Sequence, residues 1–343
     1  MERPRDLVVV GASAGGVEAL RDLVAGLPAD FAGSVLVVLH LPPGGASALP
    51  AILRRSGPLP VTSARHGEQV KHGHIYTAPP DHHLLVDDTT IQLTHGPTEN
   101  GHRPAIDTLF RSAARSRGPA ATGVVLSGAL DDGTTGLELI KARGGLAGVQ
   151  EPEDALYRGM PDNALARVRM DFILPAKEMG PTLAVYVREM VDIDGTATLS
   201  EIDEAEVLAS VSGLSPPNGG PEVVEVSKPS GLACPDCQGV LFSLDGRDTR
   251  YRCRVGHAWT AQALFEQQSR EVEQALWAAL RALEEQRDLA TRMSHDADER
   301  GFPLVADRYR RHREERSHAV EVLRRFLYEG LTPPGKDTAG ETA

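Results

Sequence analysis

Apolar runs alternate with helix-like segments over the first half of the chain. The run "LVVV" at residues 7–10 precedes the helical pattern "VEALRDLVAGL", and "SVLVVLH" precedes "ALPAILRRSG". Further on, "ATGVVLSG" lies between "AIDTLFRSAARSRG" and "GTTGLELIKARGG". Strands that are apolar throughout and alternate with helices are typical of a parallel sheet covered on both faces. The pattern predicts a doubly wound, mostly parallel, Rossmann-like α/β domain over residues 1–191, with shorter strands at "HIYTAP", "HHLLV", "IQLTHG", "LAGVQ" and "DFILP".

The pattern changes in the second half. Residues 192–230 are acidic and rich in proline, glycine and serine, which is typical of a linker. A small cysteine-containing unit follows at 231–260. Two long amphipathic patterns, interrupted by "SHDADERGFP", predict a helical hairpin over 261–330, and 331–343 reads as a disordered tail.

Composition narrows the class of protein. The 343 residues carry a formal net charge of −12 and only 4% aromatic residues, which argues against nucleic-acid binding. No apolar run reaches the length of roughly 20 residues that a membrane-spanning helix needs. The N-terminus "MERPRD" lacks a signal peptide's apolar region, so we expect a cytoplasmic protein without membrane insertion. Three cysteines fit thiols or metal ligands better than a disulfide framework.

The first strand ends in the glycine-rich loop "GASAG", residues 11–15. This loop has the G-x-S-x-G pattern of a nucleophile elbow, with Ser13 at the centre and the expected strand and helix on either side. Such a loop can instead cradle a phosphate, as in dinucleotide-binding domains. The loop by itself leaves both interpretations open.

The ends of two further strands carry residues that bear on this choice. The second strand ends in His40, where a dinucleotide site would have an acidic residue for the ribose. A histidine there is well placed as a base for Ser13, although capping or packing is the ordinary role of a single histidine. The strand predicted at "ATGVVLSG" is followed by Asp131 and Asp132, and a carboxylate here could orient His40 or cap the next helix.

Six blocks of sequence resemble those of one family. The segments "VVVGASAGGVEAL", "VVLHLPP", "YTAPPDHHLLV", "RPAIDTLFRSAA", "VVLSGALDDGTTGLELIKARGG" and "GMPDNAL" occur in this order between residues 7 and 190. They look like successive blocks of the catalytic domain of the chemotaxis protein-glutamate methylesterase (CheB) family. The ordered set is far more specific than any single motif.

The resemblance implies hydrolysis of glutamate γ-methyl esters on chemoreceptors, with release of methanol, and deamidation of receptor glutamines. The family nucleophile falls on Ser13, its base on His40 and its acid on Asp132, while the oxyanion positions fall on the backbone at Ala14 and Ala129. The resemblance assigns Asp131 no catalytic role. It requires no metal or organic cofactor for catalysis. Five other residues lie in family-like blocks and are expected to shape the rim or the fold: Arg103, Asp107, Met160, Pro161 and Asn163.

Two departures from the family pattern bear on function. Ala14 and Ala129 stand where the family often has threonine and methionine, although backbone amides can act at either position. The match begins at residue 7, so the resemblance predicts an enzyme without a receiver domain ahead of it. A second hypothesis is a catalytically silent scaffold or adaptor that acts through the C-terminal module, which consists of the cysteine-containing unit and the helical hairpin at 231–330. A third, nucleotide binding by the first glycine loop, is disfavoured by His40.

All three cysteines fall in one short motif. Cys234, Cys237, Cys253 and His257 form the spacing C-x2-C-x15-C-x3-H. The spacing resembles a zinc ribbon, in which four ligands close a tetrahedral, structural site. The alternative is a small β unit whose cysteines are buried without metal. A ribbon followed by a helical hairpin favours contacts with adaptor proteins.

Overall fold

The computed structural model describes residues 2–45, 47–193, 200, 228–244 and 249–329. These residues belong to two compact units, 1–264 and 265–343. Most of the predicted linker and the predicted tail lie outside the described residues. Within the described part, no helix is both long and apolar enough to cross a membrane.

A seven-stranded sheet, parallel throughout, forms the centre of the first unit. Its strands lie in the order β10-β9-β8-β2-β3-β5-β4. Their bounds are β2 (Leu7–Ala12), β3 (Ser34–Leu39), β4 (Val61–Ser63), β5 (His74–Thr77), β8 (Ala121–Val125), β9 (Leu146–Gln150) and β10 (Phe172–Leu174). The predicted doubly wound fold is confirmed, since β3, β5 and β4 lie on one side of β2 and the later strands β8, β9 and β10 lie on the other.

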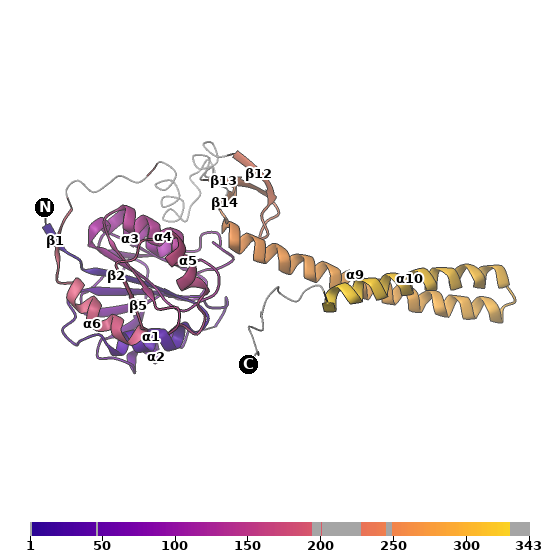
Figure 1. The fold of residues 1–343 in the computed structure, drawn as a ribbon, viewed down its shortest axis with the longest axis horizontal. Helices are drawn as coiled ribbons and strands as arrows, with labels where there is room; N and C mark the ends of the chain where they lie inside the picture. The colour runs from indigo at the N-terminus through magenta and orange to yellow at the C-terminus, as the bar shows by residue number, and fades with distance from the viewer. Residues whose placement is uncertain (1, 46, 194–199, 201–227, 245–248, 330–343) are drawn as a thin grey trace, which may run out of the picture. The chain divides into compact units, whose positions relative to one another are not determined.

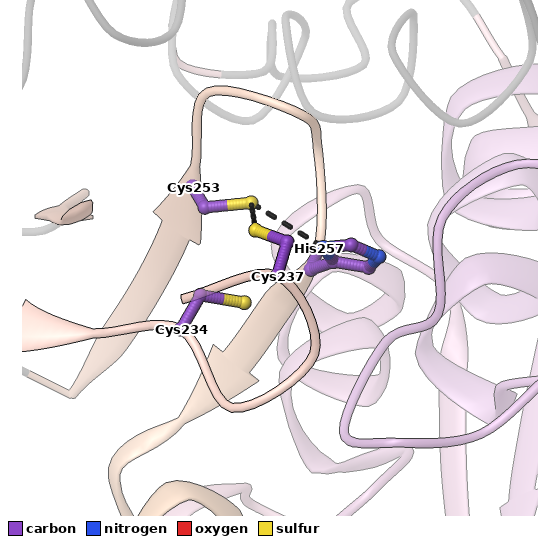
Figure 2. A group of neighbouring side chains, drawn as sticks. All are labelled: Cys234, Cys237, Cys253 and His257. Atoms are coloured by element: carbon purple, nitrogen blue, oxygen red, sulfur yellow. Dashed lines mark hydrogen bonds between the residues drawn. The ribbon is translucent and has the colours of Figure 1, made fainter. Parts of the chain in front are cut away.

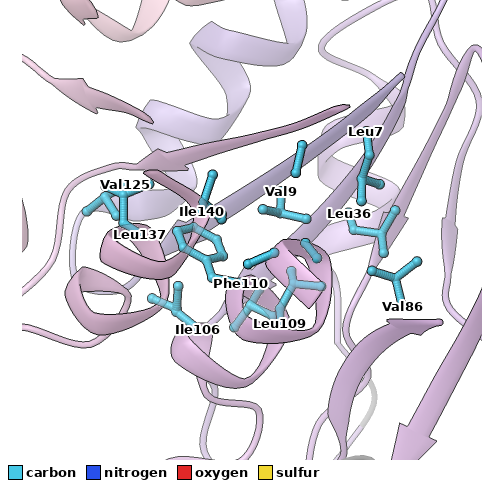
Figure 3. Close-up of a cluster of buried hydrophobic side chains, with 14 of the residues drawn as sticks. Leu7, Val9, Leu36, Val86, Ile106, Leu109, Phe110, Val125, Leu137 and Ile140 are labelled. Carbon is cyan, nitrogen blue, oxygen red and sulfur yellow. The ribbon is translucent and has the colours of Figure 1, made fainter. Parts of the chain in front are cut away.

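Helices cover both faces of this sheet (Figure 1). One face carries α1 (Gly16–Ala25), α2 (Leu49–Arg54) and α6 (Ala176–Tyr186); the other carries α3 (Ile106–Arg117), α4 (Thr134–Ala142) and α5 (Gly159–Arg167). Both faces need cover because side chains alternate along each strand. In β2, Leu7 and Val9 belong to the apolar cluster on one face, and Val8 and Val10 belong to the cluster on the other. Figure 3 shows the first cluster, in which Phe110 of α3 packs near Val9.

Three smaller elements complete the α/β domain. A hairpin of β6 (His83–Asp87) and β7 (Thr90–Thr94) packs against α3. A short 3-10 turn, η1 (Gly118–Ala120), leads into β8. The outer pair β1 (Glu2–Pro4) and β11 (Met190–Asp192) is antiparallel. The apolar pattern gave no prediction for β1, β4, β11, α5 or α6.

The cysteine-containing unit is a four-stranded antiparallel sheet. Its strands are β12 (Lys228–Ala233), β13 (Val240–Ser243), β14 (Arg250–Cys253) and β15 (Ala258–Thr260), in that order. A small core of Leu241, Tyr251, Trp259 and Leu264 supports it.

Two helices, α9 (Ala261–Glu299) and α10 (Pro303–Glu329), form the predicted hairpin. Leu280, Val320 and Leu327 are buried between them. The predicted interruption at 294–303 is wrong for its first six residues, because α9 continues through Glu299. The turn comes at Gly301, whose φ of 76° suits glycine, and Pro303 then begins α10.

Candidate active site

Three neighbouring strands bring the predicted triad together. Ser13 follows β2, His40 follows β3, and Asp132 lies in the loop after β8. These strands lie side by side in the order β8-β2-β3, and all are parallel. Their carboxyl ends therefore meet at one edge, where doubly wound sheets bind their ligands.

The loop that holds Ser13 is a tight strand-to-helix turn. The amide of Ser13 donates to the carbonyl of Ser127 at 2.9 Å, and the amide of Gly16 donates to the carbonyl of Ser13 at 2.9 Å. Gly15 has a φ of 70°, which favours glycine. A Cβ on Gly128 would lie 2.9 Å from Cβ of Ser13. The glycines thus allow the chain to approach the serine closely.

Hydrogen bonds join the three side chains in a row. Nδ1 of His40 lies 3.1 Å from Oγ of Ser13, and Nε2 of His40 lies 2.7 Å from Oδ2 of Asp132. With Nε2–H donating to the carboxylate, Nδ1 remains as the acceptor for the serine hydroxyl. This geometry is that of a nucleophile, a general base and an orienting acid, with the two ring nitrogens in the reverse of the chymotrypsin arrangement.

Asp132 lies at the N-terminus of α3. Its Oδ2 accepts from the amide of Ile106 at 2.7 Å, and its Oδ1 accepts from the amide of Asp107 at 3.2 Å. Burial alone would raise the pKa of Asp132, but the hydrogen bond and charge of His40 and the amide of Ile106 hold it well below its ordinary value. The carboxylate therefore stays ionised and stabilises a protonated His40. The sequence suggested a cap on the following helix; the capped helix is instead α3.

A cavity of about 440 Å³ opens at the serine. Ser13, His40 and the loop that contains Pro42 line one part, and His102 and Arg103 line another. The ring of His102 stacks on that of His40, with centroids 3.7 Å apart and an angle of 13° between the planes. The stack holds the His40 ring in the orientation that both of its hydrogen bonds require.

The other predicted residues surround this centre. Ala14 immediately follows Ser13, and its carbonyl accepts from Ser127 Oγ at 2.8 Å. Ala129 follows Gly128, which contacts Ser13. Arg103 is at the cavity wall, where its Nη2 lies 2.6 Å from Oδ1 of Asp81. Asn163 donates to the carbonyl of Leu130 at 2.8 Å, and Met160 and Pro161 are buried in α5.

The match to known sequences covers this domain. The family model described as CheB methylesterase matches residues 8–183, just over half of the chain. The chain belongs to the CheB methylesterase family. The matched segment contains the serine, the histidine and the aspartate of the candidate site, and we call residues 8–183 the methylesterase domain.

Individual relatives agree with this assignment. A protein-glutamate methylesterase/protein-glutamine glutaminase 2 of Methanosarcina mazei is 35% identical over 192 residues, which cover 54% of this chain and 52% of the relative. The protein-glutamate methylesterase/protein-glutamine glutaminase 3 of Burkholderia lata is 38% identical over 190 residues, which also cover 54% of this chain and 52% of the relative. The chain thus spans about half the length of these curated relatives. The crystal structure of the Thermotoga maritima CheB methylesterase catalytic domain is 32% identical, has a TM-score of 0.51, and is matched over 97% of its length and 52% of this chain.

Outside the methylesterase domain, the predicted ligand residues converge. Figure 2 shows the side chains of Cys234, Cys237, Cys253 and His257 pointing toward one another, and their ligand atoms all lie within 4.8 Å of one another. Sγ of Cys237 is 3.6 Å from Sγ of Cys253, which is 3.5 Å from Nδ1 of His257. A tetrahedral ion with metal–sulfur bonds of about 2.3 Å would place two sulfurs roughly 3.8 Å apart. The group therefore fits a metal ion.

Sequence reasoning missed several residues around the triad. The ring of His102 stacks on that of His40, although no local pattern marks His102 as part of the site. Asn100 donates to Oδ1 of Asp132 at 3.3 Å, and Thr260 of β15 bonds both Asn100 and Asp131. No local motif marks these three residues, because only the tertiary fold brings them to the triad.

Proposed function

We propose that this protein is a protein-glutamate methylesterase that hydrolyses glutamate γ-methyl esters on chemoreceptors or related signalling proteins. The products are the glutamate side chain and methanol. The observation that carries the proposal is the continuous row of hydrogen bonds from Ser13 through His40 to Asp132. The names of the relatives support the substrate class, and they extend the proposal to hydrolysis of glutamine side-chain amides.

The first half-reaction uses the serine and the histidine. Nδ1 of His40 takes the hydroxyl proton as Oγ of Ser13 attacks the ester carbonyl. The ionised Asp132 stabilises the resulting imidazolium through Nε2–H. The tetrahedral intermediate then collapses, the bond to the methoxy group breaks, and the imidazolium returns the proton so that methanol leaves. A glutamyl ester of Ser13 remains.

The second half-reaction repeats these proton transfers with water. His40 removes a proton from water as the water oxygen attacks the acyl-serine carbonyl, and it then returns a proton to Oγ of Ser13. The glutamate carboxylate is released and the enzyme is restored. We assign the oxyanion role to backbone amides at Ala14 and Ala129. Their position beside the nucleophile and the adjacent N-terminus of α1 support this assignment.

The test is methanol release from methyl-labelled receptor membranes by the purified protein, measured beside Ser13→Ala. We expect release by the native protein and loss of at least 10³-fold in the variant. Release that is equal in the two proteins would rule out Ser13 as the nucleophile. A native protein that releases no methanol, and whose serine does not react with a fluorophosphonate, would favour the scaffold hypothesis.

We further propose that the Cys/His group holds a structural Zn²⁺. Three thiolates and one imidazole are a common zinc ligand set, and the distances given above fit a tetrahedral ion. Such an ion would contribute folding free energy to the unit. With four protein ligands it would leave no position for a catalytic water.

We also propose a domain organisation and a cellular location for the protein. We assign residues 1–191 to catalysis, 192–230 to a linker, 231–260 to the metal unit, 261–330 to the hairpin and 331–343 to a tail. Exposed apolar side chains on α9 and α10, among them Trp277 and Phe326, support adaptor contacts through the hairpin. Three cysteines without a disulfide are consistent with a cytoplasmic location.

A further inference from the structure

The last strand of the cysteine-containing sheet pairs with the loop at residues 98–102. The amide of Asn100 donates to the carbonyl of Ala258 at 2.8 Å, and the amide of Ala258 donates to the carbonyl of Thr98 at 3.3 Å. Glu99 and Ala258 form a parallel bridge. The loop therefore lies along β15 like a short additional strand.

A buried ion cluster fixes this contact. One oxygen of Glu99 accepts from Arg111 of α3, and the other lies 3.2 Å from Nη2 of Arg252 in β14. All three side chains are at most 5% exposed. Burial alone would raise the pKa of Glu99, but Arg111 and Arg252 hold it at about 2. Removing one partner of this cluster would leave a buried charge unpaired, which is strongly unfavourable.

The same loop reaches the triad on its other side. His102 stacks on His40, and a Cβ on Gly101 would lie 3.4 Å from the ring of Trp259, so this ring lies against the loop. Between these contacts, Asn100 bridges two groups. Its Oδ1 accepts from the amide of Thr260 at 2.8 Å, and its Nδ2 donates to Oδ1 of Asp132 at 3.3 Å.

Thr260 fixes the orientation of this amide. Because the backbone N–H of Thr260 requires an acceptor, the carbonyl end of the Asn100 side chain faces β15 and the NH2 end faces the carboxylate. The hydroxyl of Thr260 also bonds Oδ1 of Asp131, the neighbour of the triad acid, at 2.8 Å. Thr260 is 4% exposed, so water does not replace these bonds easily.

We infer that Asn100 is a positioning residue for the triad and that the cysteine-containing sheet, through Thr260, holds it in place. Asn100 acts on catalysis by fixing Oδ1 of Asp132, so that Oδ2 stays directed at His40. The sheet that carries the Cys/His group is thus a structural part of the active site. The inference rests on the proposed triad, and it does not depend on the identity of the methylated substrate.

The substitution Asn100→Asp tests this role. Aspartate tolerates the left-handed backbone at this position, where φ is 52°, and it can still accept from Thr260, but in its ionised form it cannot donate to Asp132. The groups that face Asp132 and also titrate or carry charge are His40, His102, Asp107 and Asp131. A further negative charge there favours the imidazolium form of His40, so the rise in rate with pH should move to higher pH.

The readout is the second-order rate constant for labelling of Ser13 by a fluorophosphonate, measured from pH 5 to 9. For Asn100→Asp we expect a loss of roughly tenfold to a hundredfold and an acid limb shifted to higher pH. Asn100→Gly, which suits the same backbone, should lower the rate without that shift. Asp236→Ala is the matched control, since it removes the bond from Thr98 to Asp236 at the same contact without touching the triad.

The outcomes separate this inference from the proposed substrate. Native labelling without methanol release would reject the substrate, and the variants would still test the inference. Labelling of both Asn100 variants at the native rate and with the native pH profile would overturn it. Equal losses in Asp236→Ala and the Asn100 variants would overturn it too, because the effect would then belong to the contact in general. A native serine that does not label would reject both proposals.

Discussion

Asp107 and Asp132 each cap the helix that belongs to the other. Asp132 precedes α4, yet it accepts from the amides of Ile106 and Asp107 at the start of α3. Asp107 lies in the first turn of α3, yet its Oδ1 accepts from the amide of Gly136 in α4 at 2.6 Å. The exchange joins the two helices at the point where Asp132 contacts His40.

The pKa values of the two carboxyl groups shift in opposite directions. Burial raises the pKa of Asp107 well above its ordinary value, and the nearby charge of Asp132 raises it further. Asp132 has the opposite shift because of His40 and the amide of Ile106. A neutral Asp107 beside an ionised Asp132 is the arrangement in which two buried acids repel least, and it leaves the negative charge where His40 needs it.

The first prediction concerns Asp107. Asparagine resembles the neutral carboxyl group and can still accept from Gly136, so Asp107→Asn should change the free energy of unfolding by less than about 1 kcal/mol. Asp107→Ala leaves the helix amide without its acceptor and should cost about 1–2 kcal/mol. Urea unfolding of the two variants at pH 7 measures the difference. An asparagine variant as unstable as the alanine variant would contradict the neutral form.

The second prediction concerns Asp131. Burial is the main cause that raises its pKa to about 6, and the charge of Asp132 adds to it. Between about pH 4 and pH 6 the folded state therefore binds more protons than the unfolded state, and stability falls as pH rises through this range. Asp131→Asn removes the cost of ionisation while it retains an acceptor for Thr260.

We expect Asp131→Asn to unfold at the same urea concentration as the native protein near pH 4. At pH 8 it should be more stable by on the order of 2 kcal/mol. Urea titrations at both pH values test this difference. A gain that is the same at the two pH values would show that the substitution acts through packing and not through ionisation.

The third prediction concerns the close approach of the chain to Ser13. A Cβ on Gly128 would lie 2.0 Å from Sδ of Met160 and 2.9 Å from Cβ of Ser13. Gly128→Ala should therefore displace the serine and lower the labelling rate by roughly a hundredfold. Gly128→Ala combined with Met160→Ala relieves the larger clash. If the double variant labels no faster than the single one, contact with Ser13 itself is the limiting clash.

Much of the α/β domain follows from local pattern. Its central strands are apolar throughout because both faces of the sheet are covered. Ser13 and His40 each come directly after such a strand, and Asp132 lies in the loop that follows a third. Parallel pairing alone then brings them to one edge. The edge strands β4 and β11 and the helix α6, which contains Pro181, carry weak local signals and were not predicted.

The contacts around the triad depend on distant segments. Asn100 and Thr260 are 160 residues apart, and no spacing rule relates a loop of the α/β domain to the last strand of a separate small sheet. Similarly, the cap that Asp132 provides to α3 depends on how two helices pack. The sequence around Asp132 predicts only that a carboxylate stands near a helix N-terminus.

The last prediction concerns metal removal. Cys234, Cys253 and Trp259 belong to one small core, and Trp259 is 4% exposed whereas Trp277 is 41% exposed. We expect a unit with so few buried apolar residues to depend on the proposed Zn²⁺ for stability. In a Trp277→Phe background, dialysis against a strong zinc chelator should shift the emission of Trp259 to longer wavelength and lower the midpoint of thermal unfolding. Elemental analysis should find about one zinc per chain before dialysis and none after it.

Because β15 carries both Trp259 and Thr260, loss of metal should also slow labelling of Ser13, and added Zn²⁺ should restore the rate. Cys237→Ser should reproduce the loss without chelator, since it removes one ligand. Ser13→Ala provides the control, because it should retain the full metal content and the native emission of Trp259. If the protein keeps its native emission and unfolding midpoint after dialysis against chelator, the sheet folds without metal. Its contact with the loop at residues 98–102 would then be independent of the ion.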